Sequence, residues 1–445
     1  MIFREINTVL KANLSATQRK IVLLSSLGSM HEYYDFIMFG FMAVYFAQNL
    51  LASSVEHNFA SCIILAVFIF GYVFRPLGMF CYTKLYYRIN RVYLLNRMTS
   101  LLIIVANLMI ALIPNRENFT TLWVLIFARA LQGFARGGEA QAEFGFLHVA
   151  LRNKRGIAAF ALIAGAEIGI LVAILVNNGL NHLLTIAQMR TFGWRIPFLF
   201  GVGLSLAIYL IRYLFKVKKP LAKMVHMRPS WLIYRLYPRQ MLFTSLLSGF
   251  RSSFGWLVLL LIPLVFYSRS NSNHIYVGHL MLYSAVGSLF SSFVIFHWVK
   301  ISYSRIVLRY FIIAAIVALI GFAVAVSHNF YIGGSLLIVG IVSGGTAVLN
   351  MQVAFSCYPD SVRLSALSIS YNWGHTIISG LILLLILSLA TVFYHFGATN
   401  HPFHWWLLYN ISIVLILMSI LVLIVEAKLR NLKYYTESLN FIHKQ

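Results

Sequence analysis

Residues 21–48 read IVLLSSLGSMHEYYDFIMFGFMAVYFAQ, an apolar run with two carboxylates, Glu32 and Asp35, near its middle. A helix needs about 20 predominantly apolar residues to cross the ~30 Å hydrocarbon core of a bilayer. At about 1.5 Å per residue, Glu32 lies roughly 16 Å from the start of the run, about half of that thickness. The stretch therefore predicts a membrane-spanning helix with two acidic side chains at mid-depth.

Similar apolar runs recur along the whole chain. Hydrophobic residues make up 60% of its 445 residues and charged residues only 10%, whereas roughly 25% of the residues of a soluble domain are charged. The composition excludes a soluble globular protein and predicts an all-α membrane protein. We expect twelve transmembrane helices, at residues 21–48, 58–84, 92–113, 119–149, 156–180, 193–215, 240–267, 274–299, 305–327, 330–357, 364–394 and 403–426.

The loops between these runs alternate between basic and nearly uncharged. The formal net charge is +24, and Lys and Arg gather in both tails and in every second loop. Cytoplasmic loops of membrane proteins collect Lys and Arg. We therefore expect a bacterial-type cytoplasmic (inner) membrane protein with both termini on the cytoplasmic side. This use of positive charge leaves no reason to expect a nucleic-acid partner.

The longest basic loop, residues 216–239, divides the chain into an N-terminal half, residues 1–215, and a C-terminal half, residues 240–445, with six helices each. Two similar halves are typical of transporters that rock about a site at the membrane midplane. No GxxxxGK[ST], HExxH or GxSxG motif occurs, so neither an ATP-driven pump nor an enzyme is expected. The three cysteines lack zinc spacing, and no metal or other cofactor is expected.

Charged residues inside the apolar runs indicate where a site would lie. Five of the 11 acidic residues lie away from the ends of these runs, namely Glu32, Asp35, Glu139, Glu143 and Glu167. Since a charge at the bilayer centre costs at least about 2.5 kcal/mol, such residues usually face a cavity or one another. One helical face of the fourth run carries five polar residues, Arg129, Gln132, Arg136, Glu139 and Glu143.

Glu167, Arg251 and His375 lie about as deep in their own runs as Glu32 does in the first. The simplest interpretation is one shared site at the midplane. The structural alternative is that these groups form neutralising pairs that hold helices together. Such pairs would be Arg136–Glu139, Arg129 with an acid of the first run, and Arg251–Glu167.

The segment Gly28-Ser29-Met30-His31-Glu32-Tyr33-Tyr34-Asp35-Phe36 resembles the first-helix signature of the metabolite:proton symporters, a branch of the major facilitator superfamily. Further segments resemble that branch in the same order: Arg75-Pro76-Leu77-Gly78, Arg129-Ala130-Leu131-Gln132-Gly133-Phe134, Gly137-Gly138-Glu139, Gly193-Trp194-Arg195-Ile196-Pro197-Phe198-Leu199, and Tyr358-Pro359 with Arg363, Tyr371 and Asn372. The resemblance implies a monomeric twelve-helix transporter that works by alternating access, with protons and a small molecule as its partners in the bilayer.

One loop departs from that family. After the second helix the family carries Gly-x-x-x-Asp-Arg-x-Gly-Arg, whereas residues 83–91 read TKLYYRINR. Arg88 and Arg91 remain, but both glycines and the aspartate are gone. Because that aspartate helps to latch the cytoplasmic side in the family, either gating is altered here or another group forms the latch. Arg136, Glu143 and Glu167 also lie outside the family pattern and are candidates for tuning substrate choice.

Proton coupling needs a carboxyl whose pKa changes with its surroundings, and burial and a nearby arginine act on it in opposite directions. We predict Asp35 as the main proton carrier, with Glu32 and Glu139 as alternatives. Arg136 and Arg251 are candidates for binding a substrate carboxylate, because guanidinium pairs with it bidentately. The other predicted substrate-binding residues are Glu167, Tyr34 and Asn372. The predicted helix-pairing and gating residues are Arg75, Arg129, Gln132, Glu143, Arg88, Arg91 and Arg363.

The resemblance favours uptake of a small organic acid or of a zwitterionic osmolyte such as proline or betaine. Ile170 follows Gly169 where proton-driven exporters of this fold carry a proline, which also favours uptake. Two alternatives keep the fold: a proton-driven exporter and an importer of a polycarboxylate siderophore. A third is a non-transporting membrane sensor, which the altered loop 83–91 would suit.

Overall fold

The computed structural model describes residues 14–51, 57–89, 92–115, 118–151, 154–214, 232–256, 274–299, 303–328, 330–359, 362–383, 385 and 403–429. Within these ranges every regular element is helical and no β-strand is present. Each of the twelve predicted spans overlaps a described helix, and the ends of two of them, residues 257–267 and 386–394, lie outside the described residues. The predicted fold class, an all-α protein of the twelve-helix type, is confirmed.

The N-terminal half begins with a capped helix. Ser15 accepts a hydrogen bond from the Gln18 N–H, and the Gln18 side chain accepts one from the Ser15 N–H, which fixes the start of α2. The long helices of this half are α2 (Ala16–Leu50), α3 (His57–Ile89), α4 (Val92–Ala111), α5 (Phe119–Ala150), α6 (Arg155–Leu183) and α8 (Ile196–Leu214). The short α7 (Ile186–Thr191) and the 3-10 turn η1 (Gly193–Arg195) join α6 to α8.

The described helices of the C-terminal half are α9 (Leu232–Leu236), α10 (Pro238–Trp256), α12 (His274–Trp298), α13 (Ser304–Ser327), α14 (Ile332–Ser356), α15 (Arg363–Trp373), η4 (Gly374–Ile378) and α17 (Phe403–Leu429). Two details differ from the sequence predictions. The last part of the predicted linker 216–239 is helical, because α9 lies in it and α10 starts at a proline, which suits a first helical turn. The predicted helix 364–394 contains a π-helical turn, η4, and π turns are frequent at functional sites.

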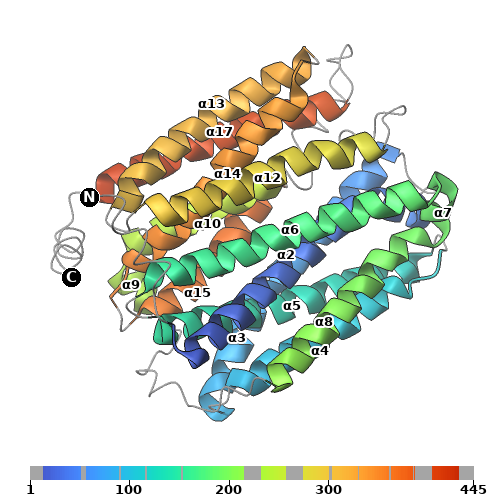
Figure 1. The fold of residues 1–445 in the computed structure, drawn as a ribbon. Coiled ribbons are helices and arrows are strands. Elements are labelled where there is room, and N and C mark those ends of the chain that lie inside the picture. Colours follow the sequence, from blue (N-terminus) through green and yellow to red (C-terminus); the bar gives the residue numbers. More distant parts are fainter. Residues whose placement is uncertain are drawn as a thin grey trace.

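Several pairs of helices join the halves, among them α6 with α14 and α5 with α15. In Figure 1, α6 lies beside α12, and these two helices pack against each other. On the other side, α3 packs against α15 and η4. Figure 1 also places α9 and α7 at opposite ends of the bundle, which are called the α9 end and the α7 end below. The halves therefore meet along a seam that runs from one end to the other.

Within the halves, glycines let helix backbones touch. A Cβ on Gly133 of α5 would lie 1.7 Å from the carbonyl oxygen of Gly71 in α3, and one on Gly165 of α6 would lie 2.2 Å from the carbonyl oxygen of Ser26 in α2. Only residues without a side chain permit such approach, and small residues are the usual contact residues of membrane helices. These contacts fix α2, α3, α5 and α6 as a rigid group.

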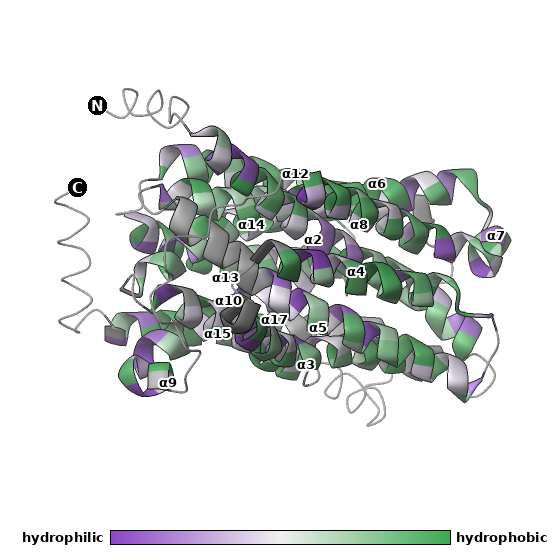
Figure 2. Cartoon of the chain, turned by 90° about the horizontal axis from the view of Figure 1, so that it is seen from below, coloured by the Kyte–Doolittle hydropathy of each residue, from purple (hydrophilic) through white to green (hydrophobic). Residues whose placement is uncertain are grey.

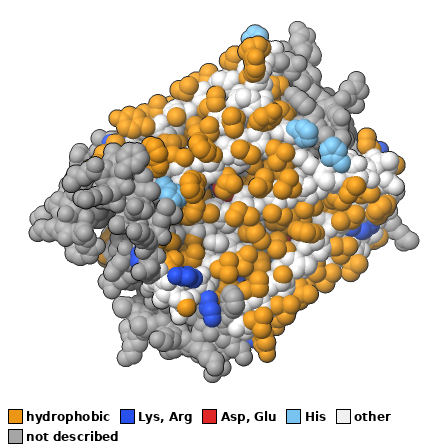
Figure 3. Space-filling model, in the orientation of Figure 1, with side chains coloured by type: hydrophobic (Ala, Val, Ile, Leu, Met, Phe, Trp, Pro, Cys, Tyr) orange, Lys and Arg blue, Asp and Glu red, His pale blue; other side chains and the backbone are white. Residues whose placement is uncertain are grey.

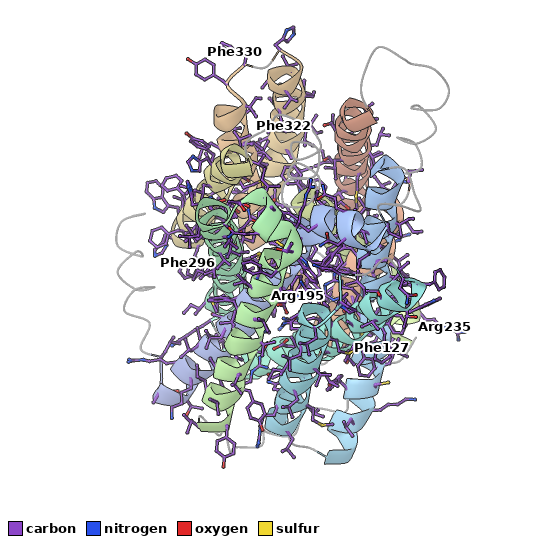
Figure 4. The ribbon with its side chains drawn as sticks, turned by 90° about the vertical axis from the view of Figure 1, so that its right-hand side faces the viewer. Phe127, Arg195, Arg235, Phe296, Phe322 and Phe330 are labelled. Carbon is purple, nitrogen blue, oxygen red and sulfur yellow. The ribbon has the colours of Figure 1, made fainter. Side chains whose placement is uncertain are left out.

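The outside of the bundle is apolar, as a lipid-facing surface requires. Figure 2 shows hydrophobic residues along the helices and hydrophilic ones toward α7 and α9, and hydrophobic side chains predominate on the face in Figure 3. Exposed Phe330 projects beside the ends of α13 and α14 (Figure 4). Among the described residues six segments are long and apolar enough to cross a membrane, Leu94–Ala111, Gly156–Leu183, Gly193–Leu214, Val277–Trp298, Ser304–Val326 and Ile332–Ser356.

Candidate functional site

A cavity lies between the two halves at the middle of the bundle. The empty space in it amounts to about 700 Å³, including the part open to solvent. Its lining comes from α2 (Ser29, Glu32, Tyr33), α6 (Leu162, Ile163, Ala166), α10 (Ser248, Arg251), α14 (Ala347, Asn350, Met351, Ala354), α15 (Leu367, Ser370, Tyr371) and η4 (His375). The wall thus combines an apolar surface with a few convergent polar groups.

Arg251 is the guanidinium in this wall, and its partner is Glu167 on the other half. Their closest atoms, Nη2 and Oε1, are 3.6 Å apart, whereas a charge-assisted hydrogen bond measures about 2.7–2.9 Å. The Nε of Arg251 and both oxygens of Glu167 have no hydrogen-bond partner among the described residues, although Ser288 of α12 faces the carboxylate. The pair is therefore loosely made and has hydrogen-bonding capacity left for a ligand.

Glu32 provides the second charge in the wall and is paired with Arg75 of α3. The Arg75 guanidinium also lies 5.0 Å from the ring centroid of Tyr72 and 6.0 Å from that of Tyr371. Tyr371 belongs to the C-terminal half, so this cation–π contact crosses the seam. His375, in the π turn, stacks on Tyr371 with ring centroids 4.0 Å apart. Glu32 is thus connected to both halves.

A second group of charges is buried inside the N-terminal half. Arg136 pairs with Asp35 at 2.6 Å and with Glu139 at 2.7 Å. Arg212 of α8 pairs with the other oxygen of Glu139 at 2.5 Å. All four side chains are less than a tenth exposed. Alternating signs along this Asp35–Arg136–Glu139–Arg212 chain satisfy each charge without water.

His31 completes this chain. Its Nδ1 is 3.1 Å from Arg136 Nη2, and a guanidinium can only donate. The imidazole therefore accepts through Nδ1 and carries its hydrogen on Nε2, which lies 2.8 Å from Ser205 Oγ and 3.4 Å from Asp35 Oδ2. Ser205 in turn donates to the carbonyl of Gly201. His31 is thus a neutral acceptor for the arginine that holds Asp35.

Arg129 is different, because no carboxylate lies within 4.0 Å of it among the described side chains. Its guanidinium lies 4.2 Å from the ring centroid of Phe39 and 4.8 Å from that of Phe68. It donates to Gln132 at 2.6 Å, Gln132 donates to Asn107, and Asn107 donates to Asp35. Arg129 therefore reaches Asp35 through two amides rather than through an ion pair, unlike the pairing with a first-helix acid that the sequence suggested.

Packed layers close the cavity toward both ends. Toward the α7 end an aromatic group spans the seam, in which Trp256 of α10 lies 5.4 Å from Tyr72 and 5.8 Å from Phe68 between ring centroids. Toward the α9 end a buried apolar group joins residues of both halves. There Phe160 of α6 stacks on Phe296 of α12 at 4.2 Å with an interplanar angle of 12°. The described side chains thus make contacts across the seam toward both ends of the bundle.

The predicted site residues fall into distinct places. Arg251 and Glu32 line the cavity, and Glu167 lies behind its wall beside Arg251. Asp35, Arg136 and Glu139 belong to the buried chain. Tyr34 donates to the carbonyl of Pro197 at 2.8 Å, and Asn372 donates to the carbonyl of Ser368 at 2.9 Å; neither lines the cavity. Arg363 donates twice to the Tyr358 carbonyl beside the start of α15. The side chains of Glu143, Arg88 and Arg91 lie outside the described residues.

Sequence reasoning missed several partners. Arg212 lies in the sixth apolar run and Glu426 in the twelfth, where the cost of a buried charge could have identified them. Glu426 pairs with both Nε and Nη2 of Arg309, joining α17 to α13. His31 and Asn107 are uncharged polar residues, and no spacing rule indicated their contacts with Arg136 and Asp35.

Comparison with solved structures identifies the arrangement. The crystal structure of a D-xylose–proton symporter matches with a TM-score of 0.67 over 91% of this chain and 96% of that one, at 15% identity. The chain has the fold of the major facilitator superfamily. At this identity the match concerns the fold alone.

Sequence comparison finds a matching family model and transporters of similar sequence. Residues 21–217 match the family model described as "Sugar (and other) transporter". Over 204 residues the chain is 30% identical to a shikimate transporter of Escherichia coli and to a putative proline/betaine transporter of Staphylococcus aureus. Over 196 residues it is 31% identical to a citrate–proton symporter of Klebsiella pneumoniae. These alignments include 44%, 44% and 43% of this chain.

The chain spans slightly under half the length of these relatives, 45%, 43% and 43%. Their names confirm the resemblance to the metabolite:proton symporter branch of the superfamily. The fold and the relatives are those of multi-pass membrane transporters rather than of enzymes, as predicted.

Proposed function

We propose that this major facilitator protein is a proton-coupled symporter that takes up a small organic acid or a carboxylate-bearing zwitterion by alternating access. It works as a monomer in a bacterial cytoplasmic membrane, with both termini on the cytoplasmic side. The proton gradient supplies the energy, and no cofactor takes part. The fold, the names of the relatives and the basic loops support this proposal.

The observation that carries the proposal concerns Glu32. It lines the central cavity with Arg251 and His375, and it also lines a smaller cavity with Asp35 and Arg136. A ligand that changes the pairing of Glu32 therefore acts within one helical turn of Asp35 on the same helix. This adjacency gives a physical route by which substrate binding and proton binding affect each other.

The proton step acts on the buried chain. When Asp35 takes up a proton, it no longer attracts Arg136 as a charge, and the 2.6 Å pair between α2 and α5 weakens. Glu139 still neutralises Arg136. The proton thus loosens one helix contact while Arg136 keeps a carboxylate partner, which it shares with Arg212.

The substrate carboxylate binds Arg251. This guanidinium has an unpartnered Nε and only a 3.6 Å contact with Glu167, so a carboxylate can bind it bidentately. A substrate that carries an ammonium can in addition approach Glu167 or Glu32. Since Arg251 and Glu167 belong to different halves, a substrate that binds to this pair changes a contact between the two halves.

Uptake into proteoliposomes tests the proposal. Radiolabelled shikimate, citrate, 2-oxoglutarate, proline and betaine are presented with an imposed inward proton gradient, and protein-free liposomes are the control. We expect accumulation of one of them that collapses when an uncoupler is added. Uptake that occurs only when the proton gradient is reversed would contradict the symporter and indicate an exporter. No transport under either gradient would favour a non-transporting sensor.

A further inference from the structure

Two histidines from different halves lie together at the α7 end of the seam. His182 is near the end of α6 and His279 near the start of α12, and their ring centroids are 6.4 Å apart. Both side chains are exposed. Figure 3 shows neighbouring histidine side chains on a face that is otherwise apolar.

A buried oxygen lies at the same helix crossing. Asn178 is one helical turn before His182, is 7% exposed, and its Oδ1 has no hydrogen-bond partner. It rests against Gly278, the neighbour of His279, since a Cβ on Gly278 would lie 1.7 Å from that oxygen. A buried acceptor without a donor is unfavourable, so this oxygen has a free energy to gain from a partner. Two imidazoles and, one helical turn from His182, an unpartnered carboxamide oxygen therefore lie where α6 packs on α12.

These groups suit a transition-metal ion. Imidazole nitrogen is the commonest metal ligand and binds Zn²⁺ at about 2.0–2.1 Å. The ion then lies roughly 3 Å from each ring centroid, so two rings on one ion have centroids roughly 5–6 Å apart. The observed 6.4 Å needs only a small rotation of two exposed side chains. Water and the Asn178 oxygen can complete the coordination.

We propose that His182 and His279, with the Asn178 oxygen, bind one divalent transition-metal ion across the two halves. Such an ion ties α6 to α12 at the α7 end and holds that end closed. Zn²⁺ is therefore an inhibitor of the transport cycle. The binding site goes beyond the proposed transport function, and only the inhibition rests on it.

Isothermal titration calorimetry tests the site: Zn²⁺ is titrated into the purified full-length protein at neutral pH, and the heat of binding is measured. We expect one ion per chain. His182→Ala and His279→Ala should each weaken binding at least tenfold, and Asn178→Ala severalfold. His328→Ala removes an exposed histidine near the end of α13, at the same end of the bundle, and should leave binding unchanged. Unchanged binding in both His182→Ala and His279→Ala, or an equal loss in His328→Ala, overturns the site.

Inhibition is measured separately. Zn²⁺ added to the α7 side of proteoliposomes should slow uptake by the wild type at least tenfold more than uptake by His182→Ala. Equal inhibition of both proteins overturns the locking role. If the protein transports none of the tested compounds, the calorimetric result still decides whether the metal site exists.

Discussion

Arg136 of α5 holds Asp35 of α2 at 2.6 Å, and the same guanidinium holds Glu139 at 2.7 Å. Arg212 pairs with the other oxygen of Glu139, so a proton on Asp35 leaves Glu139 between two guanidiniums, each of which still contacts it, and gives this group one net positive charge. His31 accepts from the nitrogen of Arg136 that faces Asp35, so this nitrogen also keeps an acceptor. The contact between α2 and α5 can thus be made and broken at low cost.

Asp35→Asn mimics the protonated carboxyl permanently. We expect gradient-driven accumulation to be lost, while exchange of labelled for unlabelled substrate continues, because the substrate cavity is unchanged. Both are measured in the same proteoliposomes. Glu426→Gln removes a buried carboxylate that lines neither cavity, and it should keep accumulation. A folded Asp35→Asn protein that still accumulates substrate, or that neither accumulates nor exchanges it, contradicts the assignment of Asp35.

Arg251→Ala removes the guanidinium from the cavity wall. Hydrogen bonds to charged groups contribute about 1.5–3 kcal/mol, so the KM for uptake should rise roughly ten- to a hundredfold. Arg251→Lys keeps the charge but not the planar fork and should be intermediate. Because Arg251→Ala leaves Glu167 unpaired, the matched control is Arg251→Ala with Glu167→Gln. Compared with Arg251→Ala alone, this double variant should regain thermal stability, while its KM for uptake should stay raised. An unchanged KM in the alanine variants rules out the anion-binding role.

The positions of the helices could be predicted from sequence because the bilayer imposes one length and one composition on every span. The predicted run 274–299 and the helix His274–Trp298 agree for this reason. The η4 turn could not be predicted, because hydropathy is the same for an α and a π turn. Bundle packing rather than local composition decides where such a turn forms.

The candidate site was predictable only in part. The cost of a buried charge identified Asp35, Glu139 and Glu167, since charges are rare in lipid. The same rule does not say which arginine each acid meets, because that depends on how helices distant in sequence cross. The structure pairs Arg136 with Asp35, whereas the Arg129 guanidinium lies against the rings of Phe39 and Phe68. The altered loop 83–91 left open what latches the α9 end, and charge patterns do not reveal the apolar packing that the structure shows there.

Gly133→Ala tests the backbone contact between α3 and α5. The added Cβ would lie 1.7 Å from the carbonyl oxygen of Gly71, which cannot move away as a flexible side chain would. Overpacking of this kind costs about 1–3 kcal/mol or more, so the melting temperature in detergent should fall by several degrees. Gly179→Ala in α6 is the matched control, because a Cβ there meets nothing within 4 Å. An equal loss in both variants would show that the contact is unimportant.

Phe160→Ala tests the closure of the α9 end. Phe160 stacks on Phe296 across the seam, and aromatic pairs contribute about 0.5–1.5 kcal/mol beyond their burial, which corresponds to roughly a two- to tenfold shift in the ratio of closed to open molecules. In a background without native cysteines, Ser370→Cys places a thiol in the cavity wall. A membrane-impermeant maleimide applied from the α9 side should label it faster by that factor when Phe160 is removed.

Phe296→Ala should raise the labelling rate similarly, and the double variant should add little, because each change removes the same contact. Phe70→Ala is the control, since Phe70 is 40% exposed and its ring pairs with Phe74 of its own helix. Its labelling rate should match that of the parent. Equal rates in the parent and all four variants would mean that the aromatic pair does not hold this end closed. The latch would then have to come from the rest of the apolar layer around Tyr358 and Leu367.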